Sequence, residues 1–206
     1  MNRLPSSYRL IASAAALVVA STATAHDFAA WGDPQDVASI NTMAAAEGCP
    51  IESPDGLNLF IASNRSAPGA QGKLDVYRAR RTAVHRSWGA PENLGTPVNS
   101  SEFDYCPTPL PGRWLMFVTS RVTEDDCFPG DTPPVAPTGG PAAGDMYLTH
   151  EHPRRGWQAP LHLGCYPQGP NTAGAEFSPS LIITLKGTFL FFSSNGYPDS
   201  QGQDIY

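Results

Sequence analysis

Carboxylate and guanidinium side chains recur at regular points along this sequence. Carboxylates gathered at one mouth could bind a cation, a sugar or a basic peptide, and two of them ~5–9.5 Å apart could hydrolyse a glycoside. The same groups could instead form ion pairs or cap backbone N–H groups inside each repeat. We favour this second role, because a feature present in every repeat usually serves the repeat itself. The recurring residues are Glu47, Glu102, Glu176, Arg65, Arg121, Asp75, Asp145 and Asp204.

The cysteines are the other reactive side chains. In an exported chain, four cysteines favour disulfides, with three possible connectivities. A zinc site is the alternative, but no C-x-x-C spacing supports it, so no metal is predicted. The four are Cys49, Cys106, Cys127 and Cys165.

Other catalytic signatures are missing from the sequence. Ser53, Ser63 and Ser194 have no G-x-S-x-G context, so a serine nucleophile is unsupported. No glycine-rich phosphate cradle precedes a helical segment. We therefore predict no catalytic residue and no cofactor.

The elements that must position these residues are short strands. Three segments of equal length, 56–65, 112–121 and 187–196, run from a turn glycine through apolar residues to a small polar pair and a final Arg or Gly. Their centres are apolar at successive positions. A strand of this kind must be covered on both faces, and in a repeat array the neighbouring units provide that cover.

Each such segment is flanked by further strand signals. An acidic residue (Glu47, Glu102 or Glu176) opens the strand before it, and an Asp-apolar-Tyr step opens the strand after it. A Trp-x-x-Pro-x-x-apolar segment then forms an edge strand, where proline is tolerated. The sequence therefore predicts an all-β fold of four-stranded antiparallel sheets, the blades of a β-propeller. The predicted blades cover about 47–95, 102–164 and 176–206, with an N-terminal outer strand at about 28–38.

These segments amount to about two and a half blades. Propellers close with roughly four to eight blades. We therefore expect an incomplete propeller, either a truncated form or an open arc.

The first residues have the pattern of a signal peptide. Arg3 and Arg9 precede an apolar run over 10–20, and Ala23-Thr24-Ala25 has the form of a cleavage site. The run is shorter than the ~20 residues of a membrane span, although a retained anchor is the alternative. We expect a signal peptide at 1–25, a mature chain at 26–206 in the periplasm or outside the cell, and no membrane span after cleavage. The full sequence has a net charge of −6, which argues against binding nucleic acid.

The blade arrangement favours one disulfide. Cys127 lies in the long connection between the second and third strands of its unit, and Cys165 lies in the loop to the next unit. Both connections reach the same face of a propeller, so we predict a Cys127–Cys165 bond. Cys49 and Cys106 then remain at matching positions on adjacent inner strands, and the sequence does not decide whether they are close enough to bond.

Several segments resemble the PD40 or WD40-like repeats of TolB-like exported propellers. The resemblance covers 31–206, and the third unit departs from it where Ser180–Lys186 replaces the Ser-Pro-Asp turn. It implies a propeller but no particular ligand. It is carried by Asn93-Leu94-Gly95, Asn99-Ser100-Ser101-Glu102, Ser53-Pro54-Asp55-Gly56, Ser63-Asn64-Arg65 and Gly72-Lys73-Leu74-Asp75-Val76-Tyr77.

Three functions remain open at this point. The favoured one is a non-catalytic exported scaffold that binds a protein or carbohydrate ligand on its loop-rich face. The second is a propeller-type glycoside hydrolase, in which Glu102 would act with Glu176 or Asp145. The third is a remnant without independent function. A carboxylate that lacks an arginine partner and breaks the repeat rule would favour the hydrolase.

Overall fold

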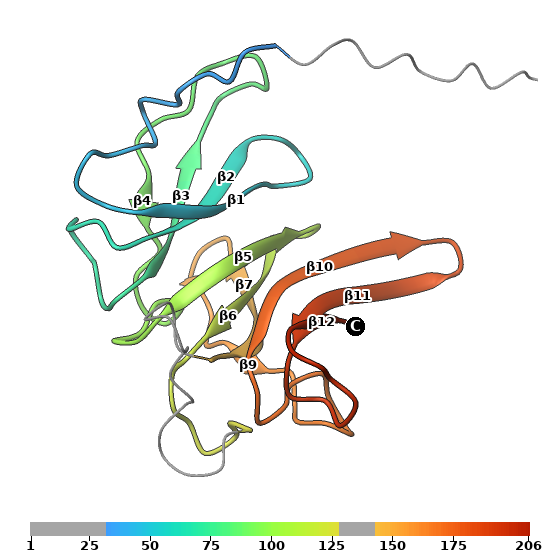
Figure 1. The fold of residues 1–206 in the computed structure, drawn as a ribbon. Coiled ribbons are helices and arrows are strands. Elements are labelled where there is room, and N and C mark those ends of the chain that lie inside the picture. Colours follow the sequence, from blue (N-terminus) through green and yellow to red (C-terminus); the bar gives the residue numbers. More distant parts are fainter. Residues whose placement is uncertain (1–31, 128–142) are drawn as a thin grey trace, which may run out of the picture. The chain divides into compact units, whose positions relative to one another are not determined.

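A computed structural model of the chain describes residues 32–127 and 143–206, which contain strands and no helices (Figure 1). The predicted signal peptide lies outside these residues. The chain divides into two units, Met1–Gln35 and Asp36–Tyr206, and every strand belongs to the second. The described part contains no helix of the length and apolar character that crossing a bilayer requires.

The strands form three antiparallel sheets of four, five and three strands, which confirms the predicted all-β class. The orders are β1-β2-β3-β4, β5-β6-β7-β8 with β9 also on β7, and β10-β11-β12; we call these the first, second and third sheets. The strands are β1 (Glu47–Glu52), β2 (Asn58–Ser63), β3 (Asp75–Arg80), β4 (Glu92–Asn93), β5 (Asp104–Leu110), β6 (Trp114–Thr119), β7 (Asp145–His152), β8 (Gly156–Trp157), β9 (Leu161–His162), β10 (Glu176–Thr184), β11 (Gly187–Ser194) and β12 (Asp204–Ile205).

The first two strands of each sheet form a hairpin. Between β1 and β2, the Ser53 hydroxyl accepts the Asn58 N–H at 3.0 Å and Gly56 adopts a left-handed φ of 68°. A glycine suits this turn because an L side chain would be strained there. In the third sheet the hairpin is longer: β10 and β11 pair as far as Thr184 and Gly187, so most of the segment that departs from the repeat is strand.

A β-bulge recurs in the first strand of every sheet. Cys49, Cys106 and Ser178 have φ values of 49°, 47° and 50°, and the pairing register shifts around each of them. Each bulged residue precedes a proline, which cannot donate to the ladder. The three units can therefore be aligned on the bulged residue.

Apolar clusters join neighbouring sheets. Phe60 and Val76 of the first sheet pack with Leu115 and Phe117 of the second. A further cluster combines Ala62, Val118 and Phe192, one from each sheet. β6 is buried from Leu115 onward, so both of its faces are covered as predicted, whereas β11 is buried only at Phe192 and Ser194.

The Trp segments differ from the prediction. The fourth strands are only the two-residue β4 and β9, which begin after the proline of each segment. Trp88 is not in a strand, and Trp157 belongs to β8, a separate extension of β7. Residues 32–38 of the predicted N-terminal outer strand form no strand, and its remainder lies outside the described residues.

Candidate functional site

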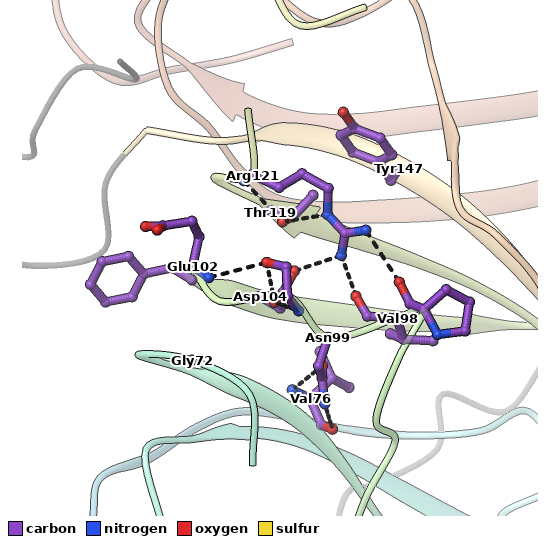
Figure 2. Close-up of polar contacts among 12 residues, drawn as sticks. Gly72, Val76, Val98, Asn99, Glu102, Asp104, Thr119, Arg121 and Tyr147 are labelled. Carbon is purple, nitrogen blue, oxygen red and sulfur yellow. Dashed lines mark hydrogen bonds and ion pairs between the residues drawn. The ribbon is translucent and has the colours of Figure 1, made fainter. Parts of the chain in front are cut away.

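Arg121 ties its sheet to the loop that precedes it. Its Nη2 lies 2.9 Å from Oδ1 of Asp104 and donates to the Val98 carbonyl, while Nη1 donates to the Pro97 carbonyl at 3.2 Å (Figure 2). Its Nε donates to the Thr119 hydroxyl at 3.1 Å. Burial raises the pKa of Asp104, and the positive charge of Arg121 opposes that rise.

Arg65 makes the same set of contacts in the first sheet. Its Nη2 lies 3.0 Å from Oε1 of Glu47 and 2.8 Å from the Ile40 carbonyl, and its Nε donates to the Ser63 hydroxyl at 3.1 Å. The guanidinium also lies 5.2 Å from the ring centroid of Tyr77. Both arginines therefore bind the acidic residue of the adjacent strand and carbonyls of an incoming loop.

The acidic residue of the second unit is Asp104, a correction to the predicted position of Glu102. Glu47, Asp104 and Glu176 each lie two residues before a bulged residue and pair across the hairpin with Ser63, Thr119 and Ser194. Glu102 precedes β5 and pairs instead with Lys73 at 2.6 Å. The prediction chose Glu102 because it has the same residue type as Glu47 and Glu176. The bulge sets the pairing register of the strand, and this register places Asp104 at the equivalent position. Gly72 marks the same contact between units, since a Cβ there would lie 2.5 Å from the Glu102 carbonyl oxygen.

The aspartates that open the third strands hold connecting loops. Asp75 Oδ2 accepts the Gln71 N–H at 2.7 Å and the Asn93 amide at 2.8 Å. Asp204 Oδ2 accepts the Gln201 N–H at 2.9 Å. These contacts are the backbone-capping role that the sequence analysis favoured for repeated acidic residues.

Two buried asparagines, which the sequence analysis did not identify as structural groups, act as additional strand partners. Asn99 accepts the Val76 N–H at 2.9 Å and donates to the Val76 carbonyl at 3.0 Å. Asn171 does the same to Met146, at 2.8 and 3.1 Å. Each asparagine precedes a hydroxyl residue shortly before the next unit, and this Asn-Ser or Asn-Thr step is the signal that could have found them.

The third unit breaks the rule followed by the first two. Gly196 stands where they have arginine, and a Cβ there would lie 1.8 Å from Oγ1 of Thr172. Oε1 of Glu176 accepts the hydroxyls of Thr172 at 2.6 Å and Ser194 at 2.7 Å. Its Oε2 is buried without a hydrogen-bond partner among the described residues. Burial, and to a smaller degree the charge of Asp145, raises the pKa of Glu176 to about 6.

The Cys127–Cys165 disulfide is present as predicted. His162 lies beside it: Nδ1 accepts the Gly164 N–H at 3.1 Å, and Nε2 lies 2.8 Å from Asp145 Oδ2 and 2.9 Å from Asn171 Nδ2. The two sulfurs and a His162 ring nitrogen lie within 4.8 Å of one another. Because the sulfurs are bonded to each other, neither provides the thiolate that zinc requires.

A hollow of about 450 Å³ adjoins this disulfide and is lined by residues of the connecting loops. Tyr166 and Thr172 are part of its lining, and Thr172 separates it from the buried Glu176. None of the repeated charges is among the described residues that line this hollow; Glu47, Asp104 and Glu102 are engaged in ion pairs elsewhere.

A groove of about 780 Å³ lies between the first and second sheets, at the ends of the strands away from Arg65 and Arg121. Its walls are the Ser53–Asn58 turn, the turn before Trp114 and the connection after Glu151. Trp114 is 44% exposed there, and its ring lies 4.7 Å from the ring of His150.

The charged groups of this groove include a pair joined by two hydrogen bonds. Arg78 binds Glu151 through two hydrogen bonds of 2.8 and 3.0 Å, and this pairing lowers the pKa of Glu151. The Arg78 guanidinium lies 5.6 Å from the ring centroid of Trp157. Its Nε–H is buried without an acceptor in the described part of the chain. The groove thus combines aromatic surface with fixed hydrogen-bonding groups, and the sequence analysis did not anticipate it.

No family model matches this chain, and no curated protein matches it in sequence.

Proposed function

We propose that the chain is a β-propeller-type scaffold that acts outside the cytoplasm and binds a carbohydrate in the groove between its first and second sheets. The observation that carries the proposal is the exposed Trp114 beside the paired Arg78 and Glu151 in a groove of about 780 Å³. Aromatic faces and planar polar side chains held in place are the usual contents of a small-ligand site.

The propeller assignment is supported by the repetition of contacts between units. Each sheet begins with the same bulge, the arginine–carboxylate contact recurs in the first two, and an asparagine joins each of the first two to the loop that follows. A repeat in which each unit contacts only its neighbours is the pattern of a propeller or solenoid. The predicted signal peptide and the Cys127–Cys165 bond are consistent with an oxidising compartment outside the cytoplasm.

Carbohydrate is favoured over a protein ligand by the contents of the groove. A sugar ring presents C–H groups that stack on an aromatic face, and hydroxyls that bond to charged planar groups. Trp114 offers the first kind of surface, and Arg78, Glu151 and Asp55 offer the second. Because the Arg78–Glu151 pair is already ordered, binding would lose little side-chain entropy there.

The experiment is an array of neutral and uronic-acid oligosaccharides probed with residues 26–206, followed by calorimetric titration of the strongest binder. Trp114→Ala should weaken that binding at least tenfold, whereas Tyr166→Ala, which removes an exposed ring at the other end of the sheets, should leave it unchanged. A wild-type protein that binds no oligosaccharide, or equal binding by the Trp114→Ala variant, would overturn the proposal.

Glycoside hydrolysis is the second candidate, and Glu176 is the observation that favours it. Within 32–127 and 143–206 this carboxylate has no arginine partner, and its pKa is raised to about 6, within the range of a general acid near neutral pH. Asp145 would be the second carboxylate, and Thr172 would have to move aside for a substrate in the hollow to reach the buried Glu176. Hydrolysis of aryl glycosides by the wild type but not by Glu176→Gln would support this function, and no hydrolysis by the wild type would exclude it for those substrates.

A further inference from the structure

Cys49 and Cys106 occupy the same bulge position in the first strands of neighbouring sheets. Both have left-handed backbone, with φ values of 49° and 47°, and β1 lies against β5. A bulge redirects the side chain that it carries. The two Sγ atoms lie 3.0 Å apart, although the residues are 57 positions apart in the sequence. In the third sheet this position is Ser178, whose hydroxyl lies 3.7 Å from the Cys106 sulfur.

The two thiols differ in their surroundings. Cys49 is exposed and Cys106 is buried, so only Cys49 is open to a reagent in solution. The contact with Cys106 lowers the pKa of Cys49 to about 6, while the same contact and burial raise the pKa of Cys106. An exposed, low-pKa thiolate next to a buried thiol is the arrangement of an attacking cysteine and its resolving partner.

We propose that Cys49 and Cys106 form a second, exchangeable disulfide that links the first sheet to the second. The oxidant is a disulfide of the glutathione type. The Cys49 thiolate attacks one sulfur of that disulfide, forms a mixed disulfide and expels one thiolate. The Cys106 thiol then attacks the Cys49 sulfur and releases the second thiolate, which takes up the Cys106 proton. Two protein thiols are oxidised, and the donor disulfide is reduced to two thiols.

This bond differs in role from Cys127–Cys165. The latter joins two connecting segments, whereas Cys49–Cys106 crosses the boundary between adjacent inner strands. The exposed Cys49 makes the new bond accessible to reductant, so it can open and close. Ser178 cannot take part in exchange, so the linkage is confined to the first two sheets.

The test uses the chain with Cys127–Cys165 intact, reduced mildly and then treated with oxidised glutathione. Non-reducing peptide mapping should find a Cys49–Cys106 cross-link and the loss of two hydrogens, and the urea midpoint should rise relative to the reduced form. Cys106→Ser should instead accumulate one glutathione on Cys49. Cys49→Ser should remain unmodified under native conditions. Ser178→Ala is the matched control and should close the bond like the wild type.

Two results would overturn the proposal. One is a wild type that forms no Cys49–Cys106 cross-link while near-ultraviolet circular dichroism shows it to be folded. The other is glutathione addition at equal rates in the two folded single variants, which would mean that Cys49 has no advantage as the attacking thiol. If a single serine variant fails to fold, Cys49→Ala or Cys106→Ala replaces it in the same comparison.

Discussion

Oδ1 of Asp104 lies 2.9 Å from Nη2 of Arg121, and the aspartate side chain is fully buried while that of the arginine is 16% exposed (Figure 2). The guanidinium reaches beyond the aspartate to carbonyl groups of the preceding loop. Arg121 therefore pairs with the buried Asp104 carboxylate and also binds the loop that connects the first and second units. Glu47 and Arg65 have the same arrangement in the first sheet, whereas the third unit has Gly196 in place of the arginine.

Removing either member of this pair should strongly destabilise the chain. We expect Asp104→Ala and Arg121→Ala each to cost about 3–5 kcal/mol, because each strands a buried partner. The double variant should cost less than the sum of the two, since the interaction is lost only once. Urea denaturation of the four proteins measures this. Glu102→Ala is the control and should cost less than ~1 kcal/mol, as its ion pair with Lys73 is exposed. Small, additive effects at Asp104 and Arg121 would contradict the structural role.

The buried asparagines should be equally sensitive at both junctions. Asn99→Ala leaves the Val76 N–H without its partner, while the Val76 carbonyl keeps the Leu94 N–H at 3.1 Å. Asn171→Ala does the same at Met146, whose carbonyl keeps the Leu163 N–H at 3.2 Å. We expect each to cost about 1–3 kcal/mol. Chemical denaturation provides the measurement, with Asn41→Ala as an exposed control that should change stability by less than ~0.5 kcal/mol. If Asn99→Ala behaves like the control, the side chain is not acting as a strand partner.

Glu176 should make stability depend on pH. Its pKa rises from 4.5 to about 6 on folding, so the folded state keeps a proton that the unfolded state releases between these values. The stabilisation from this group is fully present below about pH 4.5 and is lost as the pH rises through about 6. Above that pH the free energy of unfolding is lower by about 2 kcal/mol. Glu176→Gln should lose this decline and be more stable than the wild type at pH 7. Thermal melts from pH 4 to 8 measure it. A wild type and variant with parallel pH profiles would show that the carboxyl titrates normally.

The Cys127–Cys165 bond should contribute substantially to stability. It joins residues 38 positions apart, and closing a loop of this length restricts the unfolded chain. We expect Cys127→Ala with Cys165→Ala to cost about 2–4 kcal/mol. The measurement is the urea midpoint of the double variant, which should lie below that of the wild type when Cys49 and Cys106 are kept reduced in both proteins. An unchanged midpoint would show that the connections it joins are already held by other contacts, such as the Cys127 N–H to Asp145.

Local pattern was sufficient to predict the first three strands of each unit, but not the short fourth strands or the absence of strand at 32–38. The apolar centre of β6, with Leu115 and Phe117 buried, follows from a strand that must be covered on both faces. The Cys127–Cys165 bond could also be predicted, because alternating strands return their connections to the same face. These features depend on residues close in sequence or on the order of the strands, so the amino-acid sequence determines them.

Only the tertiary structure decided which groups lie opposite one another. Asp104 rather than Glu102 binds Arg121 because a bulge sets the strand register. Both residues are acidic and close to the start of the strand, so the sequence alone does not distinguish them. The burial of Glu176 depends on how closely Thr172 approaches Gly196. The groove beside Trp114 and the 3.0 Å separation of Cys49 and Cys106 arise between different sheets. Distances of this kind depend on how whole sheets pack, and that is a property of the folded chain that no local pattern records.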